Sequence, residues 1–176
     1  MYHHESTIVN DHRLTIENFL PEIGKEEIVK KILAGLTANQ KEISSMFFYD
    51  KAGSHLFELI TQLEEYYPTR TETTLLHEAA KAIKNDVENS NLIELGSGDC
   101  SKITLLLNAI PDDHIESICY VPFDVSISAV KTAGYKLLDT FPDLEIMGII
   151  GDFIHQLHLL PKNKKRFLCF FGSTLG

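Results

Sequence analysis

From residue 91 onward the sequence alternates between short apolar runs and amphipathic stretches, and this alternation constrains the fold more than any other feature. Four segments have the length and the β-branched or aromatic content of buried strands: 91–95, 117–124, 144–152 and 166–172. Helical periodicity separates them near 101–109 and 126–140, with a short segment near 153–160. Strands that alternate with helices in this way form parallel sheets covered by helices. The predicted fold class is therefore α/β, with a doubly wound parallel sheet.

The stretch before residue 89 has helical periodicity instead. Apolar residues recur at intervals of three and four within 28–36 and 56–63, and again between about 69 and 87. This spacing places them on one face of each helix, so a helical region is predicted over 25–88. The chain begins with a polar stretch, and its first 24 residues are predicted to form a flexible leader.

Composition and charge limit the partners. Acidic residues outnumber basic ones 25 to 16, and the net charge of −9 argues against nucleic acid or an anionic membrane surface as a partner. Cys100, Cys119 and Cys169 lie far apart without CxxC spacing, so a reduced, cytoplasmic protein without a zinc site is predicted. No stretch approaches 18 consecutive apolar residues, so no membrane-spanning segment is expected.

The sequence LIELGSGDCS at 92–101 places two glycines directly behind the first predicted strand. Gly96 and Gly98 tolerate positive φ and lack the side chains that would keep a ligand away from the backbone. In doubly wound sheets, ligands bind beyond the carboxyl ends of the strands, where the strand order reverses. On this stretch alone, a ligand-binding turn and an ordinary strand-to-helix corner fit the residues equally well.

Acidic residues end the next two predicted strands. Asp124 closes the second strand, and a carboxylate there can accept hydrogen bonds from both hydroxyls of a ribose. The third strand ends in Gly151, Asp152 and Phe153. Asp152 can accept from the exocyclic amine of adenine, and Phe153 can supply a ring contact or a backbone amide. Each acid alone also fits a helix cap, but a glycine turn and two acids at adjacent strand ends together favour an adenosine-type cofactor.

The residues around the turn favour S-adenosylmethionine over a dinucleotide. A dinucleotide turn has Gly or Ala where this sequence has Ser101, and Asp99 is a poor neighbour for a diphosphate. Glu94, two positions before Gly96, suits a cofactor with an ammonium group. Lys102 is the discordant residue, but it could meet the carboxylate of the same cofactor. An NAD(P)-dependent oxidoreductase is the less favoured alternative.

Beyond these local patterns, the sequence resembles the histidine-specific S-adenosylmethionine-dependent methyltransferase family over about residues 45 to 176. The known member of that family trimethylates the α-amino group of histidine on the way to ergothioneine. The segments that support the resemblance are FFYDKAGSHLFELITQLEEYYPTRTE (47–72), IELGSGDCSK (93–102), YVPFDVS (120–126), GDF (151–153) and FFGSTLG (170–176). The glycine turn alone is common to many proteins, whereas the EYYPTRTE segment is specific.

The resemblance implies a Rossmann-like class I methyltransferase fold with a parallel sheet and an N-terminal helical layer. It also implies in-line methyl transfer to the α-amino group of histidine or a related amino acid, a small-molecule partner. The residues that it places at S-adenosylmethionine are Gly96, Lys102, Asp124, Asp152 and Phe153. The turn itself adds Glu94 and Gly98 to this set. Tyr66 is implied to face the substrate imidazole with Tyr49 as its neighbour, and no catalytic base can be named.

The sequence departs from the family's pattern where it ends. In the family, GSTLG is followed by an asparagine that holds the substrate amino group and by a second lobe, whereas this sequence ends at Gly176. A sheet truncated after the fourth strand is expected, with an uncovered edge that favours self-association. The expected organisation is a leader at 1–24, a helical region with the substrate-side motif at 25–88 and an incomplete cofactor-binding half at 89–176. The chain alone is expected to lack turnover, and a non-catalytic cofactor-binding fragment is an alternative.

Overall fold

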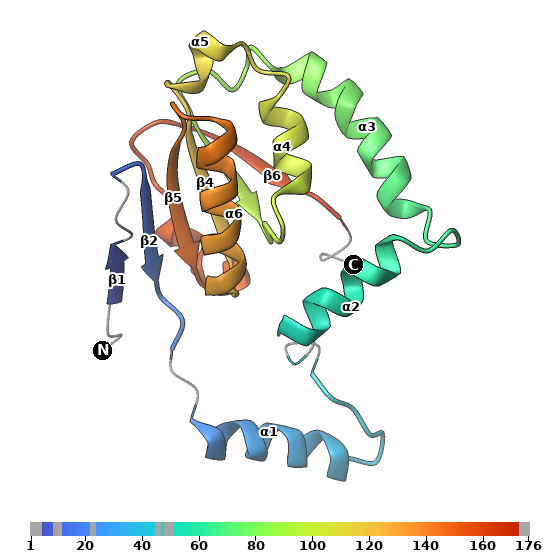
Figure 1. Ribbon diagram of the computed structural model, residues 1–176. Helices are drawn as coiled ribbons and strands as arrows, with labels where there is room; N and C mark the ends of the chain where they lie inside the picture. Colours follow the sequence, from blue (N-terminus) through green and yellow to red (C-terminus); the bar gives the residue numbers. More distant parts are fainter. Residues whose placement is uncertain (1–4, 9–11, 22–23, 45–46, 48–50, 173–176) are drawn as a thin grey trace. The chain divides into compact units, whose positions relative to one another are not determined.

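The chain divides into two compact units. One consists of Met1–Leu20 together with Tyr67–Gly176 and contains a β-sheet, and the other is Pro21–Tyr66. Figure 1 shows the helices and strands of both units. The computed structural model describes residues 5–8, 12–21, 24–44, 47 and 51–172.

The first unit is built on a six-stranded sheet with the order β1-β2-β5-β4-β3-β6. Its strands are β1 (Glu5–Ile8), β2 (Leu14–Asn18), β3 (Ser90–Leu95), β4 (Cys119–Asp124), β5 (Glu145–Ile150) and β6 (Lys165–Phe170). β1 is antiparallel to β2, and the other pairings are parallel. Strands β3 to β6 confirm the four predicted strands and, with the helices, the α/β Rossmann-like fold class. Within the described residues β6 pairs with β3 alone, and self-association through its other edge stays a prediction.

The prediction of a flexible leader over residues 1–24 is wrong for the two segments that form β1 and β2. Leu14 and Ile16 of β2 are 0% and 1% exposed and belong to the main apolar core. β2 pairs in parallel with β5, so that Leu14 lies opposite Ile146. The local signal for this strand is limited to the alternation in LTIEN. The strand depends on pairing with a segment far along the chain, which local periodicity does not reveal.

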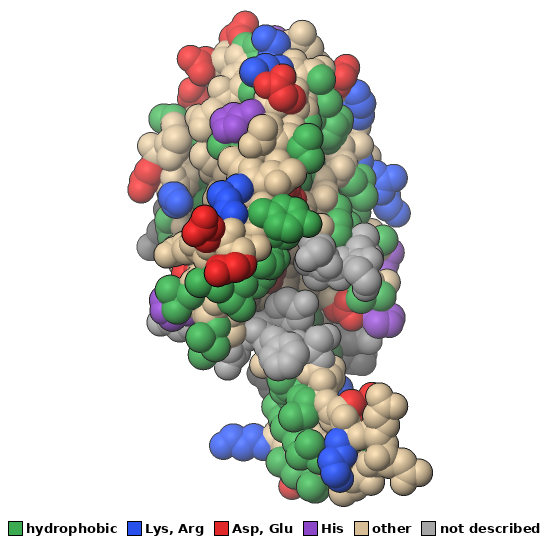
Figure 2. Space-filling view, turned by 90° about the vertical axis from the view of Figure 1, so that its right-hand side faces the viewer, with side chains coloured by type: hydrophobic (Ala, Val, Ile, Leu, Met, Phe, Trp, Pro, Cys, Tyr) green, Lys and Arg blue, Asp and Glu red, His purple; other side chains and the backbone are tan. Residues whose placement is uncertain are grey.

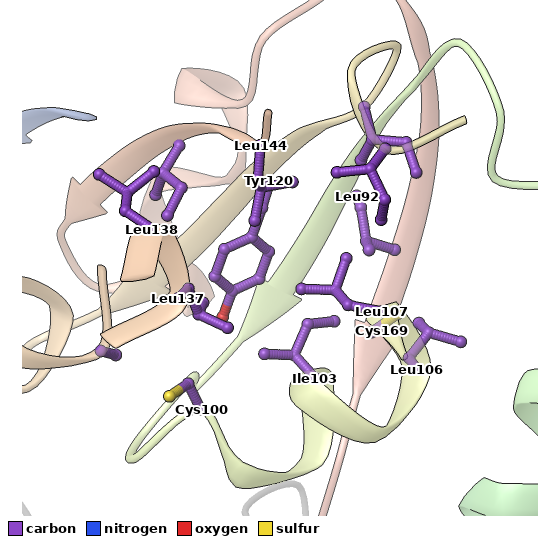
Figure 3. Close-up of a cluster of buried hydrophobic side chains, with 14 of the residues drawn as sticks. Leu92, Cys100, Ile103, Leu106, Leu107, Tyr120, Leu137, Leu138, Leu144 and Cys169 are labelled. Carbon is purple, nitrogen blue, oxygen red and sulfur yellow. The ribbon is translucent and has the colours of Figure 1, made fainter. Parts of the chain in front are cut away.

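Helices cover one face of the sheet. Helix α6 (Ile127–Thr140) packs on β2, β4 and β5, while α3 (Pro68–Ile83) packs on α4 (Ser101–Leu107). Figure 3 shows the core beneath them, with the Tyr120 ring between Leu137 of α6 and Ile103 of α4. Helices α4 and α6 confirm the two predicted near 101–109 and 126–140. A short helix that was not predicted, α5 (Asp112–Ile115), lies between α4 and β4 in the sequence.

A second apolar cluster lies on the opposite face of the sheet. It contains Ile93, Val121, Phe123 and Ile149, which alternate along their strands with residues of the first cluster. Phe153, at the start of α7 (Phe153–Gln156), packs against it, and the 3-10 helix η2 (Leu157–Leu159) follows. Because β3 and β4 are buried on both faces, their sequences lack the regular apolar–polar alternation of a half-exposed strand, and β3 buries Asn91 and Glu94 among its apolar residues.

The second unit contains α1 (Lys25–Thr37) and α2 (Lys51–Thr61), which confirm predicted helices. Val29, Leu33 and Leu36 of α1 are 52%, 55% and 41% exposed. Figure 2 shows hydrophobic side chains along one side of this helix, at the bottom of the picture. This helix is therefore amphipathic. Within the described ranges, no helix of the chain is long and apolar enough to cross a membrane.

We expect Leu14→Ala to lower the free energy of unfolding by about 2–5 kcal/mol, because it removes a fully buried side chain from the core. Thr15→Ala, at the exposed neighbouring position of the same strand, should change it by less than about 0.5 kcal/mol. Urea unfolding followed by circular dichroism measures both variants. Equal stability of the two variants would show that β2 is not part of the folded core.

Candidate functional site

The carboxyl ends of β3, β4 and β5 lie side by side at one end of the sheet. Leu95 of β3 lies opposite Phe123 of β4. The next residue of β4, Asp124, lies opposite Ile150 of β5. The N–H of Gly96 donates to the carbonyl oxygen of Phe123 at 2.8 Å, which extends this pairing into the turn. Because β6 lies on the other side of β3, the strand order reverses at β3, where ligands bind in such sheets.

Both glycines of the turn after β3 have positive φ, +72° at Gly96 and +54° at Gly98. A Cβ atom on Gly98 would meet no atom within 4 Å beyond its chain neighbours, and one on Gly96 would meet only the Phe153 ring, at 3.9 Å. A ligand can therefore approach the backbone at both positions. Between them, the Ser97 hydroxyl is buried, and no described residue forms a hydrogen bond with it. It is a polar atom that a bound molecule or water would satisfy.

Asp124 is joined directly to the glycine turn. Its Oδ2 accepts a hydrogen bond from the Gly98 N–H at 3.1 Å, and its Oδ1 accepts one from the Ser126 N–H at 2.9 Å. Each carboxylate oxygen can accept more than one hydrogen bond, so acceptor capacity remains for the hydroxyls of a ribose. The structure thus brings together Asp124 and Gly98, which the sequence analysis identified at the ends of two different predicted strands.

Asp152 and Phe153 follow β5 at the start of α7. The Asp152 carboxylate accepts from the Ile154 N–H at 2.9 Å and lies 2.6 Å from Nδ1 of His155. The hydrogen bond to His155 is the main reason why the pKa of Asp152 lies below its ordinary value. The Phe153 ring meets Phe123 edge-on at 6.3 Å between centroids, beside the space next to Gly96. Asp152 is therefore an ionised helix cap, and its neighbour Phe153 borders the glycine turn.

Glu94 lies beneath the turn. Its side chain is 2% exposed, and the Tyr120 hydroxyl donates to its Oε2 at 2.5 Å. Burial raises the pKa of Glu94 from 4.5 to about 8, and the hydrogen bond from Tyr120 opposes part of that rise. Tyr120, whose pKa burial also raises, was not singled out in the sequence because apolar neighbours surround it. A contact between Glu94 and a cofactor stays a prediction.

Lys102, in the first turn of α4, forms an ion pair with Glu72 of α3. The Lys102 Nζ atom lies 2.7 Å from Oε2 of Glu72. The other oxygen of that carboxylate accepts from the N–H of Gly172, two residues after the end of β6, at 2.5 Å. Sequence reasoning did not assign a role to Glu72, although it is the last residue of the EYYPTRTE segment. The specific sequence segment therefore already contained Glu72, but only the structure shows that Glu72 pairs with Lys102.

The start of α4 is already capped by the chain itself. Asp99 Oδ1 accepts from both the N–H and the hydroxyl of Ser101, at 3.1 and 2.8 Å. A diphosphate would have to compete for that N–H and would meet the Asp99 charge. S-adenosylmethionine has no phosphate, has two cationic groups suited to nearby acids, and has one carboxylate suited to Lys102. The residues of this site therefore fit that cofactor and do not fit a dinucleotide.

Tyr66 belongs to the second unit, where its ring meets Phe57 edge-on at 6.1 Å between centroids. Tyr49 lies outside the described residues. The predicted residues that the structure brings together are Gly96, Gly98, Asp124, Asp152 and Phe153. The roles of Tyr66 and Tyr49 stay predictions. Within the described part of the chain, no group of three His, Cys, Asp or Glu side chains could hold a metal ion.

Comparison with known proteins adds to this geometry. The family described as "Histidine-specific methyltransferase, SAM-dependent" matches residues 28–176. The histidine N-alpha-methyltransferase of Mycolicibacterium smegmatis is 37% identical over 93% of this chain and 51% of that protein. The protein of the same name from Mycobacterium tuberculosis is 34% identical, with the same two coverages. A 4-dimethylallyltryptophan N-methyltransferase of Aspergillus fumigatus is 27% identical over 86% of this chain and 47% of that protein. The chain thus spans about half the length of these relatives.

We expect the stability of the protein to fall as the pH rises from about 4.5 to about 8, because folded Glu94 binds its proton more tightly than unfolded Glu94. Below this window the stabilisation that comes from protonated, folded Glu94 is fully present. Above it this stabilisation is lost, because the buried carboxylate is charged. Glu94→Gln retains an acceptor for Tyr120 but cannot ionise, so the pH dependence should flatten by at most about 1.4 kcal/mol per pH unit.

Urea unfolding at several pH values between 5 and 8 measures this slope. Glu116→Gln, which removes an exposed carboxylate, is the matched control and should leave the slope unchanged. A Glu94→Gln slope identical to that of the parent protein would contradict the assignment of this pKa.

Proposed function

Because the chain belongs to the histidine-specific, S-adenosylmethionine-dependent methyltransferase family, we propose that it contributes the cofactor site of an N-methyltransferase. The proposed acceptor is the α-amino group of histidine or of a related amino acid. One observation supports this function above all others. Gly96, Asp124 and Phe153, from the ends of three neighbouring parallel strands, border one open turn. Since the chain spans about half of its relatives, the activity of the whole protein is part of the proposal.

The adenosine half of the cofactor binds across the ends of β3, β4 and β5. Asp124 accepts hydrogen bonds from the two ribose hydroxyls, a role supported by the spare acceptor capacity of its carboxylate. Asp152 accepts from the adenine amine, and Phe153 offers the edge or face of its ring. The backbone at Gly96 and Gly98 lies close to the ligand because neither position has a side chain.

The amino-acid half of the cofactor binds near the start of α4. Lys102 meets its carboxylate, a pairing supported by the position of the Lys102 ammonium in the first turn of that helix. Glu94 is buried under the same turn and is 2% exposed. Its contribution to an ammonium group is therefore indirect, through the shape of the turn and the local field.

The chemistry requires positioning more than activation. S-adenosylmethionine supplies a methyl group that its sulfonium already activates. The residues of this chain hold the cofactor so that the methyl carbon is presented to the acceptor in line, and such alignment is worth roughly 7–11 kcal/mol of the barrier. The acceptor amine attacks in its neutral form, and none of the described residues is assigned as the group that takes its proton.

The acceptor assignment rests on the EYYPTRTE segment and on the relatives. Tyr66 orients the imidazole of histidine, and Tyr49 is its neighbour in this proposal. Two relatives are histidine N-alpha-methyltransferases, and a third is an N-methyltransferase of a tryptophan derivative. These names support a free amino acid with an aromatic side chain as the acceptor class.

Asp124→Asn should weaken the binding of S-adenosylmethionine by about 1.5–3 kcal/mol, because the hydrogen bonds from the ribose hydroxyls lose a charged acceptor. Titration calorimetry measures the affinity, and urea unfolding of the same sample shows whether the turn still folds. Asp139→Asn, on the exposed side of α6, is the control and should bind like the parent chain. Unchanged affinity in the Asp124→Asn protein would remove this residue from the ribose site.

In a methyl-transfer assay with labelled cofactor, the whole protein of the relatives' length should label histidine or a tryptophan derivative and leave proteins and nucleic acids unlabelled. Tyr66→Phe should raise KM more than it lowers kcat, because the hydroxyl orients the ring and does not react. Label in a protein substrate, with none in histidine, would contradict the acceptor class. The same assay measures the prediction that the chain alone lacks turnover.

A further inference from the structure

Glu72 joins three separate segments of the first unit, namely α3, α4 and the residues that follow β6. Its carboxylate binds the Lys102 ammonium of α4 at 2.7 Å with one oxygen and the Gly172 N–H at 2.5 Å with the other. The side chains of Glu72 and Lys102 are 26% and 29% exposed, so the pair is partly shielded from water. This shielding distinguishes it from the Lys81–Glu78 pair on the same helix, whose side chains are 68% and 72% exposed.

The absence of a side chain at Gly172 leaves room for the Lys102 ammonium on a second side. Gly172 has φ +86°, and a Cβ atom built on it would lie 3.2 Å from Nζ of Lys102. The ammonium therefore occupies the space next to Gly172 where a side chain would otherwise lie, while it is paired with Glu72. A lysine side chain has four rotatable bonds, and without such partners it would sample many positions.

We propose that Glu72 is a positioning residue that holds the Lys102 ammonium where the carboxylate of the cofactor binds. This inference rests on the proposed function. An ammonium has three N–H donors, so the one given to Glu72 leaves two for an incoming carboxylate. The cost of ordering the lysine side chain is met when the protein folds, and the ligand then binds a preorganised cation.

Competition is a second physical effect of Glu72 on cofactor binding, and it has the opposite sign to positioning. As an anion beside Lys102, it could compete with the carboxylate of the cofactor, and its removal would then tighten binding. We infer positioning because the Gly172 N–H holds the second oxygen of the Glu72 carboxylate in place. Glu72 therefore stays beside the ammonium and does not exchange places with the carboxylate of the cofactor. The two effects therefore make opposite predictions for one variant.

The test compares two ligands that differ in the group Lys102 would bind. S-adenosylhomocysteine has the amino-acid carboxylate, and 5′-methylthioadenosine lacks it. Titration calorimetry on the 176-residue chain should show that Glu72→Gln weakens S-adenosylhomocysteine roughly tenfold, within the range for interacting neighbours, and leaves 5′-methylthioadenosine within about twofold. Glu72→Asp, which keeps the charge, should recover part of the loss. Glu78→Gln, which breaks the exposed pair on the same helix, should change neither affinity.

A Lys102→Met background completes the cycle. If Glu72 acts through Lys102, Glu72→Gln should have no further effect on S-adenosylhomocysteine once Lys102 is absent. Unchanged or tighter binding of S-adenosylhomocysteine by Glu72→Gln would overturn the inference. Equal weakening of both ligands, or a loss that persists in the Lys102→Met background, would also overturn it by showing a structural role only. A parent chain that binds neither ligand would refute the proposed function itself, which is a separate outcome.

Discussion

The parallel pairing of β3 with β4, and of β4 with β5, is the constraint on which the candidate site depends. Parallel strands end at the same edge, so residues that are distant in sequence follow their strands into one place. The register sets Leu95 opposite Phe123 and Asp124 opposite Ile150. A slip of one residue would turn Asp124 toward the other face of the sheet and break its bond to Gly98. The buried apolar residues on both faces of β3 and β4 hold this register in place.

The electrostatics of the site follow from its place above a buried acid. Glu94 lies under the glycine turn with a pKa of about 8, so near pH 7 it is mostly protonated and adds little negative charge from below. Asp124 and Asp152 stand at the rim, where backbone N–H groups bind their carboxylates. Lys102 is already paired with Glu72. The site therefore presents acceptors to a ligand with cationic groups, and it keeps one fixed cation for a carboxylate.

The sequence predicted those parts of the structure that local pattern controls. Gly96, Asp124 and Phe153 were predictable because each lies at or near the end of an apolar run, and the parallel sheet then brings them together. β2 was missed because Leu14 and Ile16 make only two alternations, and their burial depends on β5 and α6. The hydrogen bond between Tyr120 and Glu94 could not be predicted either. It requires knowing that both side chains point to the same face of adjacent strands, which only the register reveals.

In the proposed site, an adenosine-type sulfonium cofactor binds at the carboxyl ends of β3, β4 and β5. Backbone amide chemical shifts of the isotopically labelled chain, recorded during titration with S-adenosylhomocysteine, test this claim most directly. We expect the largest shifts at Gly96, Gly98, Asp124 and Phe153, with smaller changes at Lys102. Shifts concentrated on α1, or no saturable shifts at the three strand ends, would contradict it.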